Sequence, residues 1–195
     1  MKTLLLLALA AAAHAQDTDF RVTSAFPKYD TADIEFRDAS GAKWPSFLHG
    51  KPANEAGAIA FNPAKPAATF ALLCDKAAQD KGDQTRRVLG ELPQPPTATL
   101  TIIAMTAPEP AAKSKTKATH TAELTGTLEI AGKKIPVRAT TGLWLHDGKG
   151  DEKNRALMLD GTFTLKGAEL GLRSVPQVEV RFGLTAYPPR ESPRP

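Results

Sequence analysis

The chain has 195 residues, 42% of them hydrophobic and 24% charged, and a formal net charge of +4 at pH 7. This length suits one domain with its own hydrophobic core and is short for two. The basic residues are scattered and are not interleaved with aromatic residues, which argues against nucleic-acid binding. A small cluster at Lys113, Lys115 and Lys117 lies among prolines and is typical of a solvated loop.

The N-terminus has the pattern of a cleavable signal peptide over residues 1–15. Lys2 is followed by an uninterrupted apolar run over residues 4–13, and Ala13 and Ala15 are the small residues that a signal peptidase recognises. We expect cleavage between Ala15 and Gln16 and a periplasmic or secreted product. The apolar run is shorter than the roughly 20 residues of a membrane-spanning helix, so no membrane span is expected.

Apolar and polar residues alternate with a period of two along most of the remaining chain, which is the signature of strands. The candidate strands are residues 20–24, 32–37, 57–61, 67–73, 97–105, 118–130, 135–145, 155–166 and 177–187. Gly132 separates two of the longest, which predicts a hairpin. One short helix is expected near residues 82–92, and residues 105–117 are expected to form a loop.

Amphipathic strands in this number must protect their edges, and closure into a barrel does so most completely. We therefore expect an all-β, antiparallel, eight-stranded barrel over residues 16–187 and a disordered Pro-rich tail over residues 188–195. A transmembrane barrel is disfavoured, because only 6% of the residues are aromatic and such barrels need two aromatic girdles.

The alternation also predicts which side chains face the interior. The large ones, which we predict to line a ligand cavity, are Phe70, Leu72, Leu100, Ile102, Leu128, Leu143, Phe163, Val180 and Phe182. Small residues are interspersed on the same face: Ala98, Ala104, Ala122, Gly126, Ala139 and Gly161. They have two interpretations: they leave room for a ligand, or they accommodate strand curvature.

The residues that carry chemistry form no recognisable constellation. The histidines of the mature chain, His49, His120 and His146, lack metal-ligand spacing, and no serine lies in a nucleophile elbow. We expect no cofactor, no metal site and no enzymatic activity. Cys74, the single cysteine, is interpreted as a small buried residue; a reactive thiol or one that forms a homodimer is the alternative.

Two further groups have open interpretations. Trp44 and Phe47 would plug one end of the barrel or form a gate at a ligand mouth. Arg86 and Arg87 are expected on the surface, and contact with a ligand head group is the alternative.

An order of short motifs resembles the YceI-like family of exported, lipocalin-like barrels that bind polyisoprenoid lipids. The motifs are Ala-Asp-Ile-Glu-Phe at 32–36, Gly-Ala-Ile-Ala-Phe-Asn-Pro at 57–63, the polar segment 80–87, the strand-turn-strand 124–137 ending in Pro-Val, the segment 165–172 and the last strand at 178–182. Two segments depart from the family pattern: residues 88–93, where the family has a longer lid, and the Lys-rich loop at 107–117.

The resemblance implies a soluble protein that carries an apolar lipid such as a polyisoprenoid or an isoprenoid quinone, for transport, storage or sequestration. The alternative is a non-enzymatic module of the cell envelope that has lost its ligand and serves a structural or protein-interaction role.

Overall fold

The computed structural model describes residues 19–22, 32–38, 46–50, 57–62, 64–77, 91–93, 95–111, 118–146, 148 and 155–189. The predicted signal peptide, Trp44, Arg86, Arg87, the cluster Lys113, Lys115 and Lys117, and the tail from residue 190 onward lie outside these residues. So do the side chains of Phe47 and His49.

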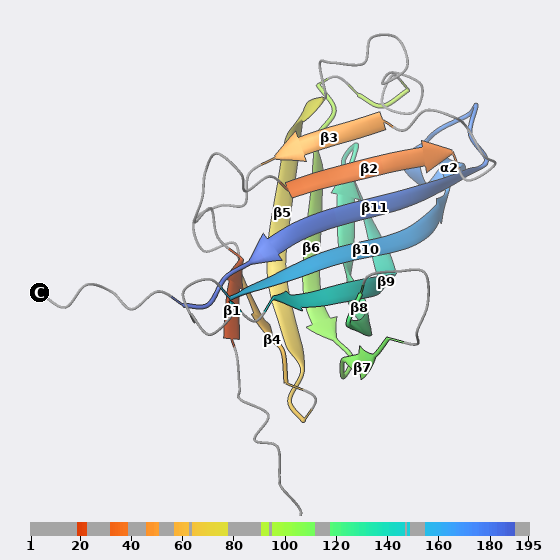
Figure 1. Ribbon diagram of the computed structural model, residues 1–195. Coiled ribbons are helices and arrows are strands. Elements are labelled where there is room, and N and C mark those ends of the chain that lie inside the picture. The colour runs from red at the N-terminus through yellow and green to blue at the C-terminus, as the bar shows by residue number, and fades with distance from the viewer. Residues whose placement is uncertain are drawn as a thin grey trace, which may run out of the picture.

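The described residues form one antiparallel sheet of eleven strands and one short helix, α2 (Gly167–Leu170) (Figure 1). The strands are β1 (Asp19–Val22), β2 (Ala32–Asp38), β3 (Ser46–Gly50), β4 (Gly57–Ala60), β5 (Ala67–Ala77), β6 (Ala98–Met105), β7 (Glu109–Pro110), β8 (His120–Ile130), β9 (Lys133–His146), β10 (Ala156–Lys166) and β11 (Gln177–Ala186).

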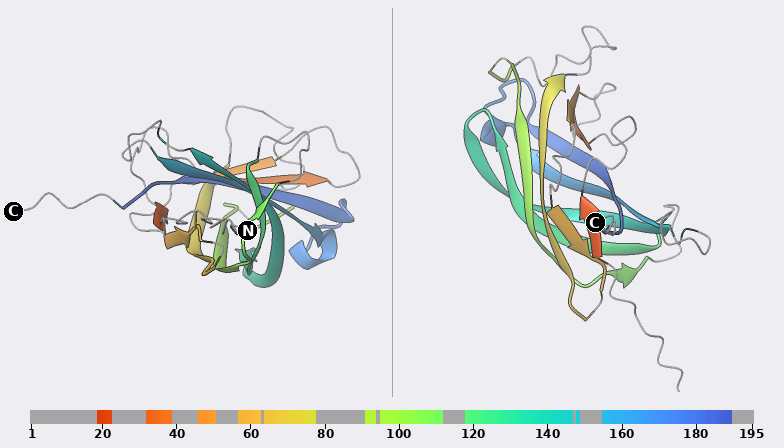
Figure 2. Two further views of the ribbon diagram at one scale, coloured as in Figure 1. Left: turned by 60° about the horizontal axis from the view of Figure 1, so that its bottom comes forward. Right: turned by 90° about the vertical axis from the view of Figure 1, so that its left-hand side faces the viewer.

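The sheet is curled into a half-barrel. Its order is β1-β4-β5-β3-β2-β11-β10-β9-β8-β6, and β5 pairs with β6 as well as with β3 and β4. The pairing of β5 with β6 therefore joins the first part of this strand order to its last strand. In two views, β2, β11 and β10 cross β5 and β6 at a steep angle, so their inner faces are opposed (Figures 1 and 2). The all-β antiparallel class is confirmed, although the sheet has more strands than the eight that were predicted.

Most predicted strands are confirmed to within a few residues, and the long hairpin is among them. β8 and β9 pair from His120 opposite Leu143 to Ile130 opposite Lys133. Only Ala131 and Gly132 connect them, and both have positive φ angles, +52° and +73°. Two residues with positive φ form the type I′ turn, whose twist matches that of the adjoining strands.

The structure describes only the end of the predicted helix at 82–92, and it contains a strand, β3, that was not among the predicted strands. Residues 82–90 lie outside the described part of the chain, while Glu91 and Leu92 form a turn and not a helix. Residues 46–50 form β3, which pairs with both β2 and β5. The described helix is the single turn α2, which covers one end of the curled sheet after β10 (Figure 1).

The predicted inward position of Ala104 is wrong. The pairing register of β6 with β8 shifts between Ile102 and Ala104, which is a β-bulge. A bulge adds one residue and reverses the alternation beyond it. Ala104 is therefore exposed, Met105 is buried, and Ile103 on the outer face is 63% exposed.

Candidate ligand-binding interior

The inner face of the curled sheet is a continuous apolar surface. All nine predicted cavity-lining side chains are buried and belong to one hydrophobic cluster: Phe70, Leu72, Leu100, Ile102, Leu128, Leu143, Phe163, Val180 and Phe182. Their placement follows from the register, because inward residues on neighbouring strands lie opposite one another. Contact of these side chains with a ligand stays a prediction.

The first strands contribute interior residues that the sequence analysis did not include. Phe20, Ile34, Phe36 and Ile59 are fully buried in the same cluster. Phe36 lies opposite Val180 and joins the core that also holds Phe163. The alternation of residues 32–37 was a signal that could have identified Ile34 and Phe36.

At two of the small inward residues, neighbouring groups fill the space that a side chain would occupy. A Cβ atom built on Gly161 would lie 2.2 Å from the Phe182 ring, which therefore occupies that space. A Cβ atom built on Gly126 would lie 2.1 Å from the Thr101 carbonyl oxygen and 3.0 Å from Ile102. At these two positions the missing side chain permits close packing, so the interpretation that both glycines leave room for a ligand is wrong.

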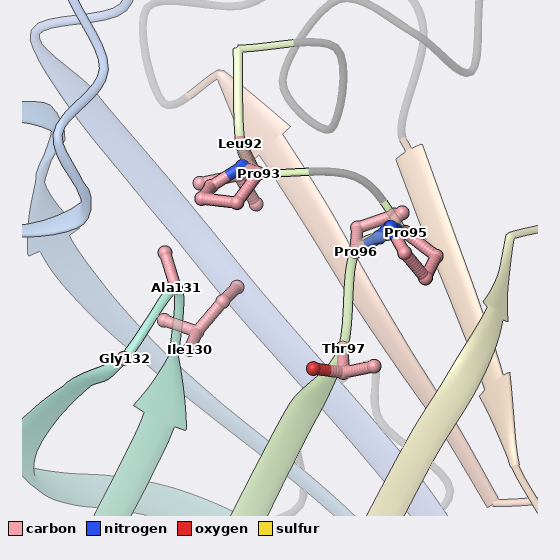
Figure 3. A pocket seen from close by; sticks show the side chains of 8 residues that line it. All are labelled: Leu92, Pro93, Pro95, Pro96, Thr97, Ile130, Ala131 and Gly132. Atoms are coloured by element: carbon pink, nitrogen blue, oxygen red, sulfur yellow. The ribbon is translucent and has the colours of Figure 1, made fainter.

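One end of the interior, beside the β8–β9 turn, is covered by α2 and by residues 91–93 and 95–97, which precede β6. Leu92, Leu170, Leu172 and Val175 are buried there. A pocket of about 310 Å³ remains beside the turn (Figure 3); it is lined by Leu92, Pro93, Pro95, Pro96, Thr97, Ile130, Ala131 and Gly132. Most of its lining side chains are apolar, and Thr97 supplies the one polar side chain among them.

Glu91 links the segment 91–93 to the loop after α2 by hydrogen bonds. Its carboxylate accepts hydrogen bonds from the backbone N–H of Arg173 at 2.7 Å, from the Ser174 N–H at 3.4 Å and from the Ser174 hydroxyl. The bond from the Ser174 hydroxyl, followed by that from the Arg173 N–H, lowers the pKa of the Glu91 carboxyl below its ordinary value. The Lys133 ammonium group binds the Glu169 carbonyl oxygen at 3.1 Å and adds a second link at the same end.

Glu91→Gln is expected to weaken this link at about pH 7 and to speed hydrogen exchange at the Arg173 and Ser174 amides, as measured by NMR. Because the folded-state pKa is lowered, the contribution of Glu91 to stability is present above the ordinary carboxyl pKa and is lost as the pH falls through the folded value. The two proteins should therefore converge once the pH falls below the lowered folded-state pKa of Glu91. Equal exchange rates at pH 7 would contradict the link.

The opposite end of the interior has a half-buried aromatic pair. The Phe61 and His120 rings meet edge to face, with centroids 5.0 Å apart. His120 Nδ1 lies 3.0 Å from Thr119 Oγ1, and the Thr119 hydroxyl donates to the Leu143 carbonyl oxygen. His120 is therefore placed by packing and hydrogen bonds on the face that the alternation predicts. His146 is exposed, as expected, and its Nδ1 accepts a bond from the Gly148 N–H.

The described residues contain no group of three or more His, Cys, Asp or Glu side chains that could hold a metal ion. Within the same ranges, none of the helices has the length and apolar character needed to cross a membrane. Cys74 is fully buried and forms no disulfide, which matches its interpretation as a small core residue.

The fold is similar to that in the crystal structure of BcnA from Burkholderia cenocepacia. The TM-score is 0.51, the sequence identity is 16%, and the match covers 80% of this chain and 96% of BcnA. No family model matches the sequence, and no curated protein matches it either. At this identity the likeness concerns the fold alone.

Proposed function

We propose that the chain is an exported, non-enzymatic binding protein that holds one long apolar lipid, of the isoprenoid type, inside the curled sheet. The circuit of strands β5, β3, β2, β11, β10, β9, β8 and β6 would form the barrel around it. The signal-peptide pattern supports a periplasmic or secreted location after cleavage between Ala15 and Gln16. Transport, storage and sequestration all require this same binding.

The observation that carries the proposal is the continuous apolar inner face. Thr141 is the one buried polar side chain among the described residues, so a ligand in the interior would meet almost solely apolar groups. Burial of apolar surface stabilises by about 25 cal/mol per Å², and a partly enclosed isoprenoid chain would gain several kcal/mol on that scale. The fold shared with BcnA and the resemblance to lipid-binding barrels support the same assignment.

Protein secreted by a bacterial host, from the full precursor, is expected to carry a lipid-sized mass in native mass spectrometry and to begin at Gln16. Ala139→Leu fills the inner face and should reduce the bound fraction, because Ala139 is fully buried. Ala104→Leu makes the same change on the outer face and should leave binding unaltered. Protein that is repeatedly empty would refute the proposal.

The packing at Gly126 and Gly161 favours a second candidate, an envelope module whose interior no longer holds a ligand. Both glycine positions are already occupied by neighbouring groups. This candidate predicts empty protein, together with a stoichiometric protein partner that is recovered from envelope extracts and lost when residues 108–117 are deleted.

A further inference from the structure

Thr141 is an exception in the otherwise apolar interior. It lies on β9 between the inward residues Ala139 and Leu143, and its side chain is 1% exposed. Its hydroxyl oxygen has no hydrogen-bond partner in the described part of the protein. A buried hydroxyl without a partner is destabilising, and valine has nearly the same shape without that cost.

The neighbours of Thr141 explain why no protein group binds its hydroxyl. The residues directly opposite are Ala122 on β8 and Gly161 on β10. Their side chains offer neither a donor nor an acceptor, and the space over Gly161 holds the apolar ring of Phe182. The hydroxyl is therefore an isolated hydrogen-bonding point in an apolar surrounding, which is the usual way in which a pocket fixes the orientation of a ligand.

We propose that the Thr141 hydroxyl is the polar anchor of the interior, and that the bound lipid presents one uncharged oxygen to it, as a hydroxyl or a carbonyl group. This inference rests on the proposed lipid-binding function and narrows its ligand class. A phosphate or carboxylate at this depth would be desolvated without a counter-charge, because the described buried residues include no charged side chain. An isoprenoid alcohol or a quinone-like carbonyl meets the requirement, and an isoprenoid phosphate does not.

Matched probes test the anchor by displacement of a fluorescent apolar dye from the delipidated protein. Farnesol and farnesene share an isoprenoid chain and differ in the hydroxyl group. We expect farnesol to bind at least about fivefold more tightly, which is the ratio expected for one hydrogen bond gained in an apolar site. Farnesal, with only an acceptor oxygen, should share this preference if Thr141 donates, and farnesyl phosphate should bind no better than farnesene.

Thr141→Val should abolish the preference for farnesol and leave farnesene binding unchanged, while Thr141→Ser should retain the preference. In the ligand-free protein, Thr141→Val should also raise the Tm by about 2–4 °C, because an unpartnered hydroxyl is removed. Equal binding of farnesol and farnesene by the unmodified protein, or an unchanged preference in Thr141→Val, would overturn the anchor and leave lipid binding intact.

Two other outcomes are decisive. A lower Tm in Thr141→Val, or failure of that variant to fold, would show that the hydroxyl has a structural partner and would overturn the inference. Binding of none of the probes would instead refute the proposed function, and the anchor with it.

Discussion

Phe182→Ala is expected to lower the free energy of unfolding by about 3–5 kcal/mol, the usual range for removing a buried phenylalanine ring. The Phe182 side chain is 3% exposed, its ring centroid lies 6.2 Å from that of Phe163, and it fills the space over Gly161. Across the sheet it lies opposite Ile34. Its loss would leave a cavity lined by strands β2, β10 and β11. Urea denaturation followed by tryptophan fluorescence measures the change.

A double-mutant cycle with Gly161→Ala tests whether the ring and the glycine form one packing unit. Gly161→Ala alone should cost about 1–3 kcal/mol, because the new methyl group must displace the Phe182 ring. In the Phe182→Ala background the same change should cost little, since the obstacle is gone. Additive effects would show that the cost of Gly161→Ala does not come from the Phe182 ring, and that the two positions do not form one packing unit.

The cycle also separates the two candidate functions. If the interior is a working lipid site, Phe182→Ala enlarges it next to Gly161, and farnesol binding should persist or strengthen. If the interior is a solid core, the same variant should only lose stability. The packing of one ring on one glycine therefore bears on function as well as on folding.

The sequence predicted most of the sheet because each long strand shows its pairing face through simple alternation. Residues 118–130 and 135–145 are the clearest case, and Gly132 marked their turn. The nine large interior side chains followed from the same rule, and all nine are buried. Where one face is buried, a slip of a single residue would expose every apolar side chain, so the pattern is strongly constrained.

The differences arise where a residue's position depends on distant contacts. Ala104 departs from the alternation because of the bulge in β6, which only the pairing with β8 reveals. β3 is a strand because β2 and β5 pair with it on either side, although Trp44-Pro45 next to it is typical of a loop. α2 has only four residues, too few for a periodic pattern; it ends at Gly171, which has a positive φ.

The candidate site was predictable to the same extent. Alternation identified the inward face, and Thr141 was on it, but the sequence does not show whether a buried hydroxyl has a partner. Nor does it show that Phe182 fills the place of a side chain at Gly161, because that contact depends on the register of β10 with β11. Positions of residues were therefore predictable, and the space between them was not.

Gly57 is the position where a single methyl group should perturb the pairing of the sheet most directly. Its φ is +153°, in a region that side chains strongly disfavour, and an added Cβ would lie 2.0 Å from the Thr69 carbonyl oxygen and 2.5 Å from the Phe70 Cα. Both obstacles are backbone atoms of β5, which cannot move without breaking its pairing with β4. Backbone strain and overpacking together should cost Gly57→Ala about 3 kcal/mol or more.

Gly132→Ala is the matched control, because Gly132 also has a positive φ, +73°, but no atom lies within 4 Å of the place of its Cβ. Gly132→Ala should lower the free energy of unfolding only by the cost of the positive φ for alanine, about 1–2 kcal/mol. The difference between the two variants in urea denaturation therefore measures the steric contact between β4 and β5. Amide exchange should rise in β1 and β4 of Gly57→Ala, since Gly57 also lies opposite Val22 of β1. Equal losses in the two variants would mean that the added methyl group at Gly57 meets no steric resistance from β5. The contact of β4 with β5 would then contribute little to enclosing the interior beside Phe70.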